Sequence, residues 1–335
     1  MMSHSRSMKT RLAGLLVALA ALTTPFTPAV AKQTLTVGTV TWIGYAPFYV
    51  ADALDSYDKY GLEVELINFA DNAAMPGALQ GGSIDGAMLT YDMVLGAVAK
   101  GWPFRVVMPI DYSNGGDAIV ATTDIKSAAD LKGKTVAYNP LSPSDFLLAY
   151  ALQSNGLTEA DITAVHMSPE AVAGAMASGS VDAGVTYEPN VSSIVISGGG
   201  DKFHVILSTR NAPGLITDVL VFKEDYIAGH KDEITALMKG YLDALAFMRE
   251  NPEQAAAYIA KAMEIPAADV LAQLQEVYNP PLDEMMGNFA PSDDILSFYT
   301  NGRMIGEILL AKDQIDAIPA IDSTLDDQFV KALLK

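Results

Sequence analysis

Acidic, aromatic and small polar residues gather at the ends of predicted strands in this sequence. The set comprises Trp42, Tyr45, Tyr91, Asp92, Asp111, Tyr112, Asp117, Asn139, Ser142, Ser144, Tyr187, Glu188 and Asp218. Open α/β sheets bind ligands beyond the carboxyl ends of their strands, so we expect these side chains to line one ligand site. Each member alone has an ordinary structural explanation, and it is their convergence that predicts a site.

The charges in this set favour a nitrogenous cation as the ligand. Carboxylates outnumber basic groups, and Arg210 is the one cation that can be placed near these loops. Carboxylates would accept the N–H groups of such a ligand. Aromatic faces would add cation–π contacts of roughly 0.5–2 kcal/mol each. We expect Trp42, Tyr45 and Tyr187 to sandwich the ligand, and Asp111, Asp117, Glu188 and Asp218 to accept its hydrogen bonds.

An anionic or zwitterionic ligand is the main alternative. Ser142 and Ser144 stand before a predicted helix at 146–154, and a helix N-terminus there would hold a carboxylate or a sulfonate. Ser144 or Asp145 would equally serve as a plain helix cap.

Catalytic and metal-binding patterns are not found in the sequence. The chain has no cysteine, which excludes thiol nucleophiles and cysteine-ligated metals. Gly133-Lys134-Thr135 resembles the end of a phosphate-binding loop, but Ala128 stands where that loop needs glycine. His166, His204 and His230 are isolated from one another. We therefore expect no enzyme, no metal and no cofactor, and a periplasmic enzyme is only a remote alternative.

Alternating strands and helices position the candidate residues. In the first part of the chain, strands are predicted at 35–40, 62–69, 84–89 and 104–110, with helices at 48–57, 73–80 and 93–100. In the second part, strands are predicted at 118–122, 135–138, 162–167, 181–186, 204–208 and 216–222. This pattern predicts an α/β protein with mainly parallel sheets covered on both faces. From residue 231 onward the pattern is helical.

The two halves echo each other. Gly-Ser-Ile-Asp-Gly-Ala at 82–87 matches Gly-Ser-Val-Asp-Ala at 179–183, and the polar stretch 111–117 lies between them. Two similar lobes joined by a glycine-containing crossover predict a protein that closes on something held between them. Gly115 and Gly116 would let the chain bend there.

The N-terminus and the net charge indicate an exported protein. Arg6, Lys9 and Arg11 precede an apolar run at 12–22 and a small-x-small site ending at Ala31, which is the pattern of a secretory signal peptide cleaved near that residue. Without the signal, 18 basic residues face 40 acidic ones. This charge disfavours nucleic acid as a partner, and no apolar stretch is long enough for direct membrane insertion.

Several segments resemble periplasmic solute-binding proteins of ABC importers. They are Tyr45-Ala-Pro-Phe, Lys-Tyr-Gly-Leu-Glu-Val at 59–64, the two echoed segments, and Ala-Asp-Leu-Lys-Gly-Lys-Thr-Val at 129–136. The branch is similar to the nitrate, sulfonate, taurine and thiamine-pyrimidine-precursor group. Within it, 111–117 and 211–218 resemble binding proteins encoded beside urea carboxylase, a subgroup linked to urea- or guanidine-like compounds.

The resemblance implies a type II periplasmic binding fold. Residues 1–31 would be the signal peptide, 32–117 and 217–335 one lobe with the C-terminal helices packed on it, and 118–216 the other lobe. The protein would be a periplasmic monomer that takes a small-molecule ligand to an ABC permease and its ATPase in the inner membrane. Taurine, another sulfonate, nitrate or a pyrimidine precursor of thiamine are the alternative ligands, and a receptor-type sensor is an alternative role. The thiamine-pyrimidine synthases of the family use clustered cysteines, which this chain lacks.

Overall fold

Two mixed β-sheets organise the chain. The computed structural model describes residues 32–335, so the predicted signal peptide and its cleavage site lie outside the described residues. The larger sheet has the strand order β11-β4-β10-β3-β1-β2. Its strands are β1 (Gln33–Thr39), β2 (Leu62–Asn68), β3 (Gly86–Thr90), β4 (Phe104–Ser113), β10 (Thr217–Lys223) and β11 (Val277–Tyr278).

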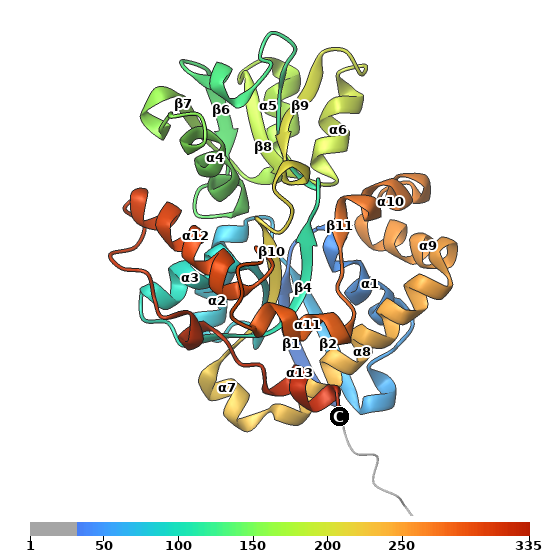
Figure 1. Cartoon of the computed structure of the whole chain (residues 1–335). Coiled ribbons are helices and arrows are strands. Elements are labelled where there is room, and N and C mark those ends of the chain that lie inside the picture. Colours follow the sequence, from blue (N-terminus) through green and yellow to red (C-terminus); the bar gives the residue numbers. More distant parts are fainter. Residues whose placement is uncertain (1–31) are drawn as a thin grey trace, which may run out of the picture. The chain divides into compact units, whose positions relative to one another are not determined.

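The smaller sheet has the order β7-β6-β8-β5-β9. Its strands are β5 (Asp117–Thr122), β6 (Thr135–Tyr138), β7 (Thr163–His166), β8 (Ala183–Tyr187) and β9 (Phe203–Ser208). We call the six-stranded sheet and the helices packed on it lobe one, and the five-stranded sheet with α4, α5 and α6 lobe two. The chain passes from lobe one to lobe two after β4 and returns before β10 (Figure 1).

The α/β class is confirmed, but the sheets are mixed and not mainly parallel. In lobe one β1 runs parallel to β2 and β3, whereas β10 is antiparallel to both of its neighbours, β3 and β4. In lobe two β6 runs parallel to β7 and β8, whereas β5 is antiparallel to β8 and β9. A strand that returns the chain to a sheet beside the strand by which it left must run in the opposite direction. Strand periodicity does not carry that information.

Helices cover both sheets. Their bounds are α1 (Ala46–Ala53), α2 (Met75–Gly81), α3 (Tyr91–Ala99), α4 (Pro143–Gln153), α5 (Pro169–Ser178), α6 (Asn190–Ser197), α7 (Glu224–Gly229), α8 (Lys231–Glu250), α9 (Pro252–Met263), α10 (Ala267–Gln273), α11 (Leu282–Phe289), α12 (Phe298–Ala311) and α13 (Gln328–Leu333). Among the described residues no helix is long and apolar enough to cross a membrane.

The C-terminal helices pack mainly on lobe one. The helical pattern predicted from residue 231 onward is present. Ile234, Leu237, Met238 and Tyr241 of α8 are fully buried, and α8 and α9 pack on α1. In contrast, α12 packs on α3 of lobe one and also on α4 of lobe two. This helix therefore spans the boundary between the lobes.

The crossover between the lobes is shorter than the seven-residue stretch 111–117. Strand β4 continues through Ser113 and β5 begins at Asp117, so only Asn114, Gly115 and Gly116 lie between the strands. Gly115 has a φ of 132°, a conformation that L side chains rarely adopt. A Cβ atom on Gly116 would lie 2.4 Å from Cη2 of Trp42. The close packing against Trp42 therefore requires glycine at position 116, whether or not the chain bends at this point.

Candidate functional site

A small cavity lies between the lobes where the crossing strands meet. Its walls come from both lobes: Val40, Trp42, Tyr45, Asn72, Thr90, Asp117, Pro143, Tyr187, Ile216 and Asp218. Five of these were predicted as ligand-binding residues from their positions near strand ends. The cavity volume is about 10 Å³, enough for one water-sized molecule. A larger ligand therefore needs the lobes or the side chains to separate.

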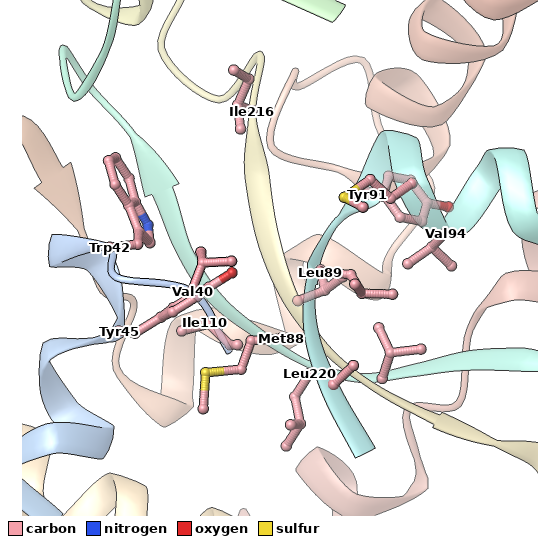
Figure 2. Packing of buried hydrophobic residues seen from close by; sticks show 14 of the residues in the cluster. Val40, Trp42, Tyr45, Met88, Leu89, Tyr91, Val94, Ile110, Ile216 and Leu220 are labelled. Carbon is pink, nitrogen blue, oxygen red and sulfur yellow. The ribbon is translucent and has the colours of Figure 1, made fainter. Parts of the chain in front are cut away.

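Trp42 is held at the edge of the cavity by a buried carboxylate behind it. It follows β1, and its indole Nε1 donates to Asp111 Oδ1 at 3.2 Å and Oδ2 at 3.3 Å. Gly44 permits this contact, because a Cβ there would lie 2.3 Å from the carboxylate carbon of Asp111 and from Nε1 of Trp42. Figure 2 shows Trp42 beside Tyr45, with Ile216 across from them.

Asp218 lies directly across the strand pair from Asp111. The two residues are partners in the register of β10 and β4, and both are buried. The Tyr45 hydroxyl donates to Asp218 Oδ1 at 2.6 Å. The antiparallel pairing of β4 and β10 brings these two carboxylates side by side although they are distant in sequence. Each lies on a strand that carries the chain between the lobes.

Asp117 completes the acidic group from lobe two. It begins β5, pairs in register with Tyr187 of β8, and is 3% exposed. The Asp117 backbone N–H donates a hydrogen bond to Ser113 Oγ at 3.0 Å. Within residues 32–335, no Lys, Arg or His side chain forms an ion pair with Asp111, Asp117 or Asp218. No basic side chain in the described part of the chain therefore compensates these groups when they ionise.

Burial raises the pKa of each of these carboxyl groups. Desolvation, with a smaller contribution from the charge of Asp92, raises the pKa of Asp117 to about 7. Burial, and then the charge of Asp117, raises the pKa of Asp111 well above its ordinary value. Burial and the charge of Asp111 do the same to the pKa of Asp218. Such raised pKa values are typical of functional sites. Each of these carboxylates would need a positively charged partner to stay ionised, and the described part of the chain does not supply one.

Two contacts connect the lobes over the cavity. The Tyr187 hydroxyl of lobe two donates to Asn72 Oδ1 of lobe one at 2.9 Å. The Trp42 and Tyr187 rings meet edge to face, with centroids 5.7 Å apart and planes at 82°. The predicted sandwich would require these rings to separate and turn, so that a flat ligand could enter between them.

Replacing Gly44 by alanine is expected to destabilise the protein by about 1–3 kcal/mol, because the added methyl group has no room between Asp111 and Trp42. Urea denaturation would measure this free energy of unfolding. Gly81→Ala in α2 is a matched control, since a Cβ there would meet no atom within 4 Å. Equal stability of Gly44→Ala and the wild type would show that the Trp42–Asp111 contact is loosely packed.

The structure places two predicted aromatic residues away from the cavity. Tyr91 is fully buried, its ring packs on Phe298 at 4.8 Å, and its hydroxyl is 2.8 Å from that of Thr324. It points away from Trp42 and Tyr45 (Figure 2). Tyr112 stacks on Tyr278 at 5.3 Å. Side chains alternate along a strand, so Tyr112 faces the side opposite to Asp111.

Glu188 also lies apart from the cavity lining. Its carboxylate accepts hydrogen bonds from the Ser192 backbone N–H at 3.1 Å and from the Ser192 hydroxyl at 2.8 Å. Glu188 therefore stabilises the start of α6, and its carboxylate has hydrogen-bond donors without a ligand.

The polar residues before α4 act mainly as local structure. Ser142 is the N-cap of α4, accepting from the Ser144 backbone N–H at 3.2 Å and donating to the Asn139 carbonyl at 2.7 Å. Pro143 has no N–H, and Asp145 adds a carboxylate to the first turn. This helix end is therefore a poor anion site. The buried Ser144 Oγ and Asn139 Oδ1 nevertheless have no hydrogen-bond partner among the described residues.

Sequence reasoning missed half of the cavity lining. Asn72 is in the single-turn helix η3 (Asn72–Ala74), and Thr90 is the last residue of β3. The Thr90 hydroxyl is buried with no partner among residues 32–335, so it has a hydrogen bond available for a ligand. The position of Thr90 at a strand end was a signal that could have identified it, whereas Val40, Pro143 and Ile216 are ordinary apolar residues.

No group of three or more His, Asp or Glu side chains in the described part of the chain is arranged to hold a metal ion.

Comparisons with known proteins agree with this architecture. The chain is 25% identical over 208 residues to the taurine-binding periplasmic protein of Escherichia coli, covering 62% of this chain and 64% of that protein. Its fold matches the periplasmic aliphatic sulphonate binding protein SsuA of Escherichia coli with a TM-score of 0.69, at 22% identity, covering 87% and 96% of the two chains. It also matches the periplasmic nitrate-binding protein NrtA of Synechocystis PCC 6803, with a TM-score of 0.71, 17% identity and coverage of 90% and 88%.

A family model also matches a continuous part of the chain. The match runs over residues 42–255, which is more than half of the sequence and includes Trp42, Asp111, Asp117 and Asp218. The two solved structures show the fold, and the family match shows the membership: this chain belongs to the NMT1/THI5-like family.

Proposed function

We propose that this protein is the periplasmic solute-binding component of an ABC importer and that it captures a small nitrogenous cation, such as a guanidine or an amidine. Family membership and the two-lobed fold support the class. The cationic ligand rests on one observation: Asp111, Asp117 and Asp218 are buried together without a basic partner in the described part of the chain. Two of them line the cavity with Trp42, Tyr45 and Tyr187.

A planar cation would satisfy what this site lacks. Its N–H groups would donate to Asp117 and Asp218 and to the free Thr90 hydroxyl, and its charge would offset the repulsion between the carboxylates. Trp42 and Tyr187 come from different lobes, so a ligand between them would hold the lobes together. The solute would then pass to an inner-membrane permease that recognises the closed form.

A taurine-like or other sulfonate ligand is the second candidate, because the named relatives and fold neighbours bind taurine, sulphonate and nitrate. The site offers such an anion little. Arg210, the nearest candidate cation, is already paired with Glu276, and the first turn of α4 carries Asp145.

The pH dependence of binding separates these candidates. Burial raises the pKa of Asp117 to about 7, so a cation must displace the Asp117 proton at pH 5.5, whereas Asp117 is mostly ionised at pH 8. Guanidinium is therefore expected to bind at least tenfold more tightly at pH 8 than at pH 5.5. A sulfonate would show the opposite trend, since protonation removes the negative charge that repels it.

The experiment is a thermal-shift screen of guanidines, amidines, ureas, taurine, sulfonates, nitrate and pyrimidines at both pH values, followed by calorimetry of each hit. A ligand at a hundred times its Kd stabilises by about 2.7 kcal/mol. Stabilisation by sulfonates alone, stronger at pH 5.5, would remove the cationic ligand from consideration. Chemical turnover of a hit would contradict the role as a binding protein.

A further inference from the structure

A second cavity is lined by residues that neighbour the first cavity along the chain: Ala73 follows Asn72, and Ser142 precedes Pro143. Its volume is about 260 Å³, and its walls come from α2 and α3 of lobe one, α4 of lobe two and the region around α12. Met93, Trp102 and Phe146 make much of the surface apolar. This cavity has room for a small organic molecule without any side-chain movement, unlike the first.

A buried carboxylate lines this second cavity. Asp92, in the first turn of α3, is 6% exposed. Within residues 32–335 no basic side chain forms an ion pair with it, and backbone N–H groups at the start of α3 stabilise its ionised form. Burial raises the pKa of Asp92 to about 6, so it is largely ionised at neutral pH. The cavity thus contains a buried negative charge with which no basic side chain of the described residues is paired.

Two helical glycines keep the cavity open. Gly77 in α2 and Gly96 in α3 both line it, and a Cβ on either would meet no atom within 4 Å. Glycine is unfavourable inside a helix compared with alanine. A larger side chain at either position would therefore extend into open space without a clash at its Cβ atom.

We infer that this second cavity is a binding site for a small organic ammonium with an apolar body, whose charge pairs with Asp92 and whose body contacts Trp102, Met93 and Phe146. Lys100, the basic residue on the cavity wall, is exposed and lies eight residues from Asp92, about 12 Å along α3. At that distance its charge is largely screened by water and salt. The site touches both lobes, so its ligand would favour the same closed form as a ligand in the first cavity.

The two tryptophans of the chain make the two cavities separately observable. Trp42 lines the first cavity and Trp102 the second. In Trp42→Phe, tryptophan fluorescence reports on the second cavity. Titration of this variant with benzylammonium is expected to give a saturable change in emission. Benzyl alcohol, which has the same shape without the charge, should give none at equal concentration.

Two substitutions in the Trp42→Phe background test the assignment. Asp92→Asn removes the charge and keeps the shape, and Gly96→Leu fills the cavity with a good helix former. Each is expected to weaken benzylammonium binding at least tenfold. Absence of a saturable signal, equal binding of benzyl alcohol, or full binding by both variants would overturn the inference. Gly96→Leu keeps the test decisive if Asp92→Asn folds poorly.

The complementary variant, Trp102→Phe, reports on the first cavity through Trp42. Its response to guanidinium tests the proposed function alone. A guanidinium response there, with no benzylammonium response in Trp42→Phe, would leave the proposed function intact and refute the second site. The reverse pattern would retain the second site and refute the cationic solute.

Discussion

Asp218→Asn is expected to weaken guanidinium binding at least tenfold, which corresponds to about 1.4 kcal/mol. The change keeps the shape of the side chain and the hydrogen bond from the Tyr45 hydroxyl, which is 2.6 Å long, so what is lost is charge. Truncating one partner of a buried charge pair commonly costs still more. Isothermal titration calorimetry of the wild type and the variant at pH 8 measures the difference.

The same variant is expected to be more stable than the wild type when no ligand is bound. Burial raises the pKa of Asp218 well above its ordinary value of 3.8, so the folded protein retains a proton that the unfolded chain loses. Stability due to this group is complete below pH 3.8 and falls as pH rises toward the folded pKa. The gain in Tm of Asp218→Asn should therefore be present at pH 8 and vanish near pH 4.

Glu188→Gln is the matched control for the binding measurement. Glu188 is also a buried carboxylate, 6% exposed, but its partners are on Ser192 and it lies outside the cavity lining. Its guanidinium affinity should stay within about twofold of the wild type. If Asp218→Asn binds as well as Glu188→Gln, Asp218 does not contact the ligand.

Lys312→Met is expected to remove about 3 kcal/mol of stabilisation. Part of this loss should lower the free energy of unfolding, and part should weaken the association of the two lobes. Lys312 follows α12, and its Nζ lies 2.6 Å from Asp145 Oδ1 and 2.9 Å from Glu159 Oε2, both in lobe two. The side chains of Lys312 and Asp145 are 14% and 5% exposed. Removing one partner of a buried ion pair leaves the other without compensation.

Because this bridge joins the lobes, part of its loss should appear as weaker ligand binding. Urea denaturation and calorimetry together separate the two contributions. Lys331→Met, which breaks an exposed bridge to Asp327, should change stability by less than about 0.5 kcal/mol. Replacing Lys312 by Met and Asp145 by Leu together should recover stability. Unchanged ligand affinity in Lys312→Met would mean that closure does not depend on this bridge.

The sequence was sufficient to predict the cavity residues that carry charge or an aromatic ring at a strand end. Trp42, Tyr45, Asp117, Tyr187 and Asp218 all line the same cavity, because the strand-end rule applies wherever strands meet at one edge. The rule does not say which way a side chain points. Tyr91 follows a strand as the rule requires, but it begins α3 and its side chain is buried in the core, outside the lining of this cavity.

Contacts between the lobes were beyond prediction from the sequence. Asn72 faces Tyr187, and Lys312 faces Asp145, across 115 and 167 residues of chain. Only the tertiary arrangement brings such pairs together, and neither Asn72 nor Lys312 belongs to a motif. The two-residue strand β11 and the short helix α7 are likewise too brief to produce a periodic signal.

The register of β10 against β4 makes Asp111 and Asp218 cross-strand partners within the framework of the fold. The acidity of the site is thus set at two positions whose backbone hydrogen bonds do not depend on the side chain. Substitutions at this pair can alter the charge of the site while the sheet keeps its strand order. The pair is therefore a compact starting point for engineering binding proteins whose site has a chosen charge.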